Sequence, residues 1–147
     1  MSSAYEIRVQ RLNETPDAPK LETPEAAFRY WQSVITTMPW FIPDRELCVA
    51  IMLNTRLRVT GHSLVSIGTL NEAVVHCRDV WRAAVVLSAY AVVLGHTHPS
   101  GDPTPSQADT RLTRRMVEAG NLLQIDLLDH LIIGDGKWFS FKEAGIL

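Results

Sequence analysis

Residues 96–109 read HTHPSGDPTPSQAD, a stretch that places two histidines, a serine and an aspartate around a loop rich in proline and glycine. His96 and His98 are two positions apart, so their rings project to the same side of an extended chain. The prolines and Gly101 turn the chain sharply, which brings the following helix back toward the rings. Imidazoles and carboxylates are good ligands for a divalent metal. This stretch therefore predicts a metal site.

Asp109 is predicted to lie on the apolar face of that helix. It begins a stripe that continues through Leu112, Met116 and Ala119 at helical spacing. A buried carboxylate needs a partner, because an unpaired buried charge is costly, and a metal held with two neutral imidazoles would supply one. Ser106 lies one helical turn earlier, so its hydroxyl is expected beside the metal rather than on it.

The elements around this stretch alternate between strand and helix. A buried strand is predicted over 91–94 and ended by Gly95, so that the histidines follow its end directly. The next helix is predicted to begin near Thr104 and Pro105, because Thr104 and Gln107 have the spacing of a capping box, and to end near Gly120. The remaining elements expected are a helix from Thr23 to about Met38, strands over 47–53 and 59–67, a helix over 78–88, and a hairpin of 124–133 with 138–141. This order predicts an α/β fold in which helices pack on a mixed sheet.

The predicted ligand set also indicates the metal and its chemistry. Two histidines and one aspartate leave a fourth tetrahedral position for water, as in a catalytic Zn²⁺ site, where the pKa of the water falls to roughly 7. A carboxylate must then take and return the proton. Between Arg45 and His96 the acids are Glu46, Glu72 and Asp79. Glu46 is favoured as the base, because it starts a buried strand whose pleat can aim it at the site.

Composition describes an ordinary globular protein of one domain, with 46% hydrophobic and 20% charged residues in 147. The formal net charge of −2 does not favour a nucleic-acid partner, although a local basic patch fits within a neutral total. Cys48 and Cys77 form no CxxC pair and are expected to be reduced. The N-terminus lacks the layout of a secretory signal and the apolar run over 83–95 is too short for a bilayer, so no membrane partner and a cytoplasmic location are expected.

Other polar residues are assigned structural roles. His62, His76 and His130 have no partner at ligand spacing, and Asp129 is expected to orient the ring of His130. A solvated helix face is favoured over a nucleic-acid patch for Arg111, Arg114 and Arg115.

H-x-H-P followed by six residues and S-x-x-D resembles the JAMM motif of the JAB/MPN metalloprotease superfamily. The extended form HTHPSGDPTPSQAD is similar to the RadC branch in particular. The likeness continues through GTL at 68–70, VVHCRDVWRAA at 74–84 and LLDHLIIGDGKWFSFKEAGIL at 127–147. It covers residues 45–147 as a RadC-like MPN domain, preceded by an extended arm (1–22) and a helix with a linker (23–44).

The resemblance implies the MPN fold, which is similar to the α/β/α arrangement of cytidine deaminases. It implies Zn²⁺ held by His96, His98 and Asp109 with water as the fourth ligand. It also implies Glu46 as the general base and Ser106 as a residue that helps to bind the oxyanion of a tetrahedral intermediate. Related enzymes with this motif cut peptide or isopeptide bonds.

Two departures from the family pattern stand out. RadC proteins usually carry a DNA-binding helix-hairpin-helix region before this domain, whereas residues 1–44 indicate only an arm and one helix. Thr97 stands where asparagine is common and is expected to point away from the ligands, with little consequence.

Three functions follow from the sequence. The first is a zinc-dependent hydrolase that acts on an amide bond of a protein or peptide. The second is a DNA-repair or DNA-processing factor, such as a metal-dependent nuclease. The third is a non-catalytic MPN scaffold that binds other proteins. The intact ligand set argues against the scaffold, and the near-neutral charge argues against the DNA-processing factor.

Overall fold

The computed structural model describes residues 3–6, 18–69 and 75–147. Most of the expected arm, and Glu72 among the candidate bases, lie outside the described residues. In chain order the elements are α1 (Pro24–Ser33), the 3₁₀ helix η1 (Ile35–Thr37), β1 (Leu47–Leu53), β2 (Val59–Ile67), α2 (Cys77–Val86), β3 (Ala91–Thr97), α3 (Gln107–Leu123), β4 (Asp126–Ile133) and β5 (Trp138–Ser140). Among them no helix is long and apolar enough to cross a bilayer.

The strands form one mixed sheet in the order β2-β1-β3-β4-β5. β3 and β4 run parallel, joined by α3, and the other neighbouring pairs are antiparallel. β1 and β3 therefore lie inside the sheet with a hydrogen-bonded neighbour on each side. The predicted mixed α/β sheet is confirmed, as are the bounds predicted for β1 and β2.

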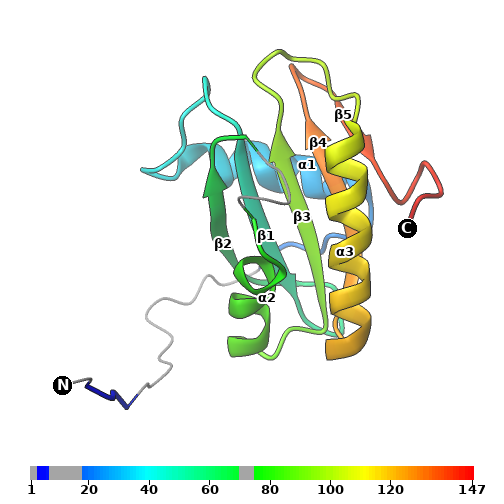
Figure 1. Ribbon diagram of the computed structural model, residues 1–147. Coiled ribbons are helices and arrows are strands. Elements are labelled where there is room, and N and C mark those ends of the chain that lie inside the picture. Colours follow the sequence, from blue (N-terminus) through cyan, green and yellow to red (C-terminus); the bar gives the residue numbers. More distant parts are fainter. Residues whose placement is uncertain (1–2, 7–17, 70–74) are drawn as a thin grey trace.

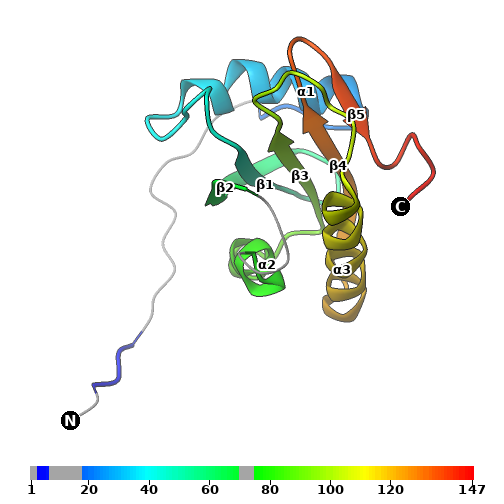
Figure 2. The same ribbon diagram turned by 45° about the horizontal axis from the view of Figure 1, so that its top comes forward.

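Helices cover both faces of the sheet. Figures 1 and 2 show α1 on one face and α2 with α3 on the other. β1 is buried along its whole length and alternates between the two cores. Toward α2 and α3 it contributes Cys48, Ala50 and Met52. Toward α1 it contributes Val49, Ile51 and Leu53. The end of the expected arm is attached to the sheet, because the backbone of Lys20 forms an isolated antiparallel β-bridge with Arg58 and Leu21 is buried.

α1 begins as predicted but ends earlier. Thr23 caps it by accepting a hydrogen bond from the N–H of Ala26, and Pro24 follows. The helix ends at Ser33 rather than near Met38. The reason lies in the run Val34–Thr37, whose β-branched side chains disfavour the helix. Hydroxyls of this run and of Ser33 also bind backbone carbonyls one turn back.

β3 continues through the first histidine instead of ending at Gly95. The strand runs to Thr97, because it pairs with β1 and β4 on both sides as far as residue 96. Gly95 does not break the strand; it leaves room for the indole of Trp31. α3 likewise extends beyond Gly120, to Leu123, and Gln124 ends it in a left-handed conformation. Gly120 packs closely against Trp81 and the carbonyl of Ile125.

Replacing Gly95 with alanine is expected to lower the free energy of unfolding by about 1–3 kcal/mol, because the new methyl group would overlap ring atoms of Trp31 in a closed core. Urea unfolding measures this loss. Gly61→Ala is the matched control, since Gly61 lies in the edge strand β2 and a methyl group there would meet only the ends of two flexible side chains, Leu87 at 3.0 Å and Met52 at 3.7 Å. Equal losses in the two variants would contradict the packing argument.

Candidate metal centre

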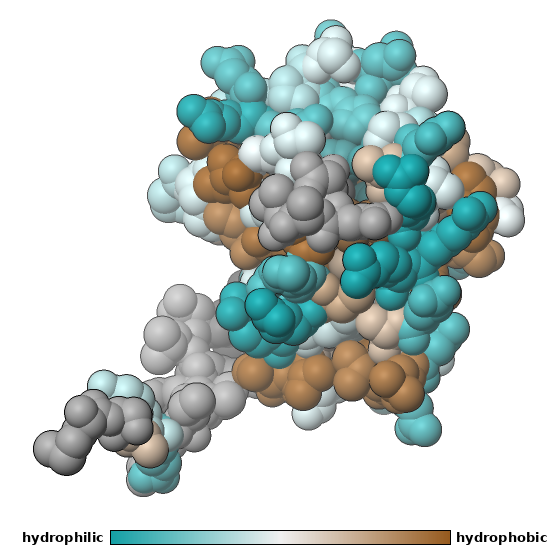
Figure 3. All heavy atoms as spheres, in the orientation of Figure 1, coloured by the Kyte–Doolittle hydropathy of each residue, from teal (hydrophilic) through white to brown (hydrophobic). Residues whose placement is uncertain are grey.

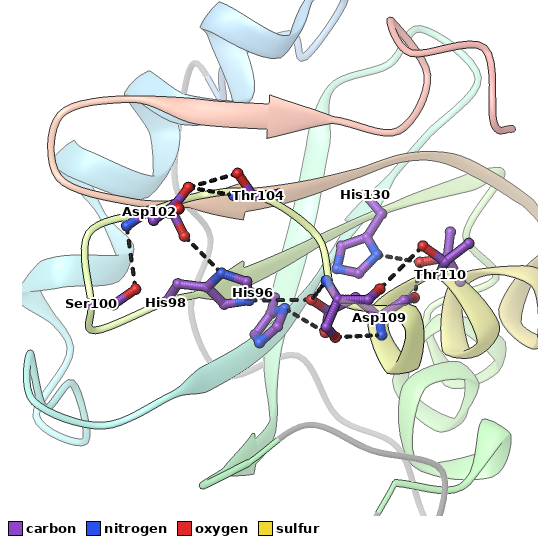
Figure 4. A network of polar contacts seen from close by, with 10 residues as sticks. His96, His98, Ser100, Asp102, Thr104, Asp109, Thr110 and His130 are labelled. Atoms are coloured by element: carbon purple, nitrogen blue, oxygen red, sulfur yellow. Dashed lines mark hydrogen bonds and ion pairs between the residues drawn. The ribbon is translucent and has the colours of Figure 1, made fainter.

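Side chains from distant parts of the sequence meet at one end of β3. His96 lies in β3, His98 directly follows it, Asp109 lies in the first turn of α3, and Glu46 directly precedes β1. Ligand atoms of Glu46, His96 and His98 lie within 4.8 Å of one another and could hold a metal ion. Figure 4 shows the two histidines and Asp109 turned toward one another.

The pairing of β1 with β3 explains why Glu46 reaches the histidines. The two strands are antiparallel, and Cys48 lies opposite His96. Glu46 is two residues before Cys48, and His98 is two residues after His96. Because side chains of a strand alternate between faces, all four residues belong to the face covered by α2 and α3. A segment fifty positions away thus completes the site.

Asp109 is 2% exposed and contacts both histidines. Its Oδ1 lies 3.7 Å from Nδ1 of His96, and its Oδ2 lies 3.2 Å from Nε2 of His98. The same carboxylate accepts a hydrogen bond from the N–H of Ser106 at 2.8 Å, and the hydroxyl of Ser106 accepts one from the N–H of Asp109 at 3.0 Å. The pair is a capping box that holds Asp109 at the start of α3.

This capping box differs from the predicted one, which joined Thr104 to Gln107. The hydroxyl of Thr104 donates instead to Asp102 at 2.7 Å. Thr104 also precedes Pro105, and a residue before proline is disfavoured in helical conformation. α3 therefore begins at Gln107, with the extended Ser106 as its cap.

One ring nitrogen of His98 binds a backbone carbonyl, and the other faces Asp109. Its Nδ1 lies 2.9 Å from the carbonyl oxygen of Asp102, which can only accept, so Nδ1 carries the hydrogen. The other nitrogen, Nε2, is thereby directed at a carboxylate oxygen of Asp109 that lies 3.2 Å away. An imidazole nitrogen and a carboxylate oxygen in this arrangement can share a proton or bind the same metal ion. The donor set therefore fits a metal ion.

His96 has the properties of a neutral ligand. It is 1% exposed, and neither ring nitrogen has a hydrogen-bond partner among the described residues. Burial lowers the pKa of His96 to about 4, against the opposing effect of the Asp109 charge and with a smaller lowering from His98. The imidazole is thus uncharged at neutral pH, as metal binding requires.

Cys48 is next to this site but does not share its chemistry. Burial, reinforced by the charge of Asp109, raises the pKa of the Cys48 thiol far above its usual range. The thiol therefore stays protonated at neutral pH, and only the thiolate is a nucleophile or metal ligand.

Of the alternative bases to Glu46, Asp79 lies elsewhere. It is in the first turn of α2, where its carboxylate accepts a hydrogen bond from the N–H of His76 at 3.0 Å. Glu72 is outside the described residues. Glu46 is therefore the acid, among the candidate bases that the structure describes, that joins the histidines.

His130 lies beneath the site and is fully buried. The hydroxyl of Thr113 donates to the carbonyl of Asp109, so it accepts the Nδ1 hydrogen of His130 at 2.7 Å. Asp129 does not orient this ring, contrary to expectation; its carboxylate binds the backbone N–H of His130 and the hydroxyl of Ser140. Nothing in the sequence indicated the contact with Thr113, since the two residues belong to different elements.

The metal-free protein is expected to lose stability as the pH falls below about 6.5. Burial, together with His96 and His98, lowers the pKa of His130 well below its ordinary value. Below about pH 6.5 His130 becomes protonated in the unfolded chain but stays neutral in the folded chain. This difference favours unfolding by up to about 1.4 kcal/mol per pH unit. Urea unfolding between pH 8 and 5 measures this slope. In His130→Leu the slope of the free energy of unfolding against pH should be smaller by the contribution of one proton. An unchanged slope in that variant would contradict the role given to His130.

A pocket of about 320 Å³ adjoins the metal centre at the start of α3. It is lined by Pro105, Ser106, Gln107, Thr110, Arg111 and Arg114. Ser106 is exposed here, and because its oxygen accepts the N–H of Asp109, its own hydrogen remains able to donate. The arginines are exposed on α3, as expected.

A mixed sheet between helices, with a group of residues that could hold a metal ion at the end of β3, is consistent with a JAB (MPN) domain. A family model described as the RadC-like JAB domain matches residues 21–146, and the chain belongs to this family. The resemblance seen in the sequence is thereby confirmed. The match begins at Leu21, so it includes α1.

Three curated relatives that the chain matches are each named UPF0758 protein. One from Desulforamulus reducens is 50% identical over 104 residues, which are 71% of this chain and 46% of the relative. Another from Moorella thermoacetica is 52% identical over 104 residues, 71% of this chain and 45% of the relative. A third from Chlorobaculum parvum is 42% identical over 118 residues, which are 79% of this chain and 53% of the relative. The chain thus spans about half the length of the curated relatives it matches.

Proposed function

We propose that this protein is a zinc-dependent hydrolase that cuts a peptide or isopeptide bond of a protein or peptide substrate. One observation carries the proposal: Nε2 of His98 lies 3.2 Å from the Asp109 carboxylate, next to Glu46 and to buried His96, whose ring nitrogens have no hydrogen-bond partner among the described residues. The buried Asp109 carboxylate faces both imidazoles, and this arrangement supports a metal centre with His96, His98 and Asp109 as ligands.

Zn²⁺ suits this donor set better than harder divalent ions. Imidazole nitrogen favours zinc and other transition metals, whereas Mg²⁺ and Ca²⁺ favour sites made of oxygen. Three protein ligands leave one position open, as in catalytic rather than structural zinc sites. When bound, the ion would supply Lewis-acid chemistry, which acidifies a water and polarises the substrate carbonyl.

The surrounding residues supply the remaining steps. Glu46 takes the proton of the attacking water and returns it to the departing amine. The hydroxyl of Ser106 donates to the oxygen of the carbonyl under attack. His98 is oriented by the carbonyl of Asp102, and Asp109 is oriented by the capping box of α3. These contacts hold the proposed ligands without the metal.

The test begins with the bound metal. We expect purified protein to hold one Zn²⁺ per chain, measured by elemental analysis at neutral pH. The protein is then assayed as isolated, after EDTA treatment and after addition of Zn²⁺, against a peptide library, a ubiquitin-like conjugate and DNA. Cleavage of an amide bond that EDTA abolishes and Zn²⁺ restores is the expected result.

Each other outcome contradicts the proposal in a defined way. Metal-dependent cleavage of DNA alone would replace it with the DNA-processing function. Stoichiometric metal without turnover of any substrate would favour the scaffold. Absence of stoichiometric metal at neutral pH would overturn both hydrolytic functions.

A further inference from the structure

The hydroxyl of Thr97 joins the two strands that carry the metal centre. Its Oγ1 accepts a hydrogen bond from the N–H of Leu47 at 2.8 Å and lies 3.3 Å from the carbonyl oxygen of Arg45, to which it donates. One hydroxyl can make both bonds, since it has one donor and two acceptor positions. The groups it binds belong to the two peptide units on either side of Glu46.

On the side that faces β3, the hydrogen bonds of the sheet do not hold Glu46 in place. The pairing of β1 with β3 ends at Cys48 and His96, so Glu46 lies beyond the last registered pair. On its other side, the carbonyl of Glu46 accepts the N–H of Gly68 at 2.8 Å. The Thr97 side chain therefore takes the place of the missing ladder bonds between β3 and the segment that carries Glu46.

We propose that Thr97 is a positioning residue that fixes the carboxylate of Glu46 beside His96 and His98. This inference rests on the proposed function, in which Glu46 is the base. With both flanking peptide units tied to β3, the segment cannot rotate about Glu46 without breaking a hydrogen bond to the strand that carries His96. The structure thus gives position 97 a role that the sequence alone did not indicate.

The decisive variant is Thr97→Val, which keeps the shape of the side chain and removes both hydrogen bonds. We expect kcat to fall by about 10- to 100-fold with little change in KM. Thr97→Ser, which keeps the hydroxyl, should recover most of the rate. Thr60→Val is the matched control, because Thr60 donates to β1 at Met52, at the opposite end of the strand. Thermal unfolding confirms that each variant is folded.

A second measurement needs no substrate. Co²⁺ replaces Zn²⁺, and its visible spectrum reports changes around the ion. Glu46→Gln should alter this spectrum, Thr97→Val should alter it in the same direction, and the double variant should resemble Glu46→Gln alone.

The two measurements separate the inference from the proposed function. A wild-type protein without turnover defeats the proposed function, and the Co²⁺ spectra still decide the role of Thr97. A Co²⁺ spectrum of Thr97→Val equal to that of wild type would overturn the inference. So would a Thr97→Val substitution that changes the spectrum as much in the Glu46→Gln protein as it does in wild type. So would a folded Thr97→Ser protein as impaired as Thr97→Val.

Discussion

Glu46→Gln should reduce hydrolysis by about 10²- to 10⁴-fold while the protein still binds one metal ion per chain. The amide has the shape of the carboxylate but cannot take a proton from water. Glu46 directly precedes β1 and lies within 4.8 Å of ligand atoms of both histidines, so the side chain is close enough to act on a water held there. Elemental analysis and turnover, measured on the same sample, test this prediction.

The result also distinguishes two roles for Glu46. Its carboxylate lies in the cluster that could hold the ion, so it is close enough to be a ligand as well as a base. Parallel loss of metal and activity would make it a ligand and would contradict the prediction. Glu118→Gln serves as control, because Glu118 is an exposed carboxylate on α3. Its replacement should leave both metal content and turnover unchanged.

Asp109→Asn is expected to have opposite effects on the metal-free and the metal-bound protein. With metal, affinity should fall by about 100-fold or more, because a charged ligand is lost. Without metal at pH 8, the free energy of unfolding should rise by about 1–3 kcal/mol, because a buried charge is removed.

Asp109→Ala separates the ligand role from the helix cap. Asparagine keeps an oxygen for the N–H of Ser106, whereas alanine does not. The alanine variant should therefore lose metal and also lose about 1 kcal/mol in the metal-free state. Chelator competition and urea unfolding with EDTA measure the two effects. Metal-free Asp109→Asn that is less stable than wild type would contradict the account that the buried charge of Asp109 destabilises the metal-free protein.

Sequence patterns correctly predicted features that depend on residues close together in the chain. The apolar run of β1, the Thr23 cap and the turn around 134–136 needed no knowledge of the fold. Some errors also had local causes, as where the β-branched run 34–37 ends α1 early. Others arose where a tertiary neighbour decided the outcome. Gly95 resembled a strand end, yet Trp31 fills the space above it and pairing with β1 and β4 carries the strand onward.

The residues that meet at the end of β3 could be named from the sequence, but the contacts between them could not. Histidine spacing and the apolar stripe of α3 indicated His96, His98 and Asp109, and the position of Glu46 before a buried strand indicated that residue. The contacts that orient them were not visible in the sequence, because they join residues through backbone groups. Asp102 binds His98 through its carbonyl, and Thr97 reaches Glu46 through the flanking peptide units.

The separation of Glu46 from the histidines has a consequence during synthesis of the chain. β1 leaves the ribosome long before β3, and the site does not exist until the two have paired. A nascent chain that has reached only α2 carries Glu46 but none of His96, His98 and Asp109. On the proposed assignment, a partly folded chain cannot cut its neighbours, and activity begins only with the finished sheet.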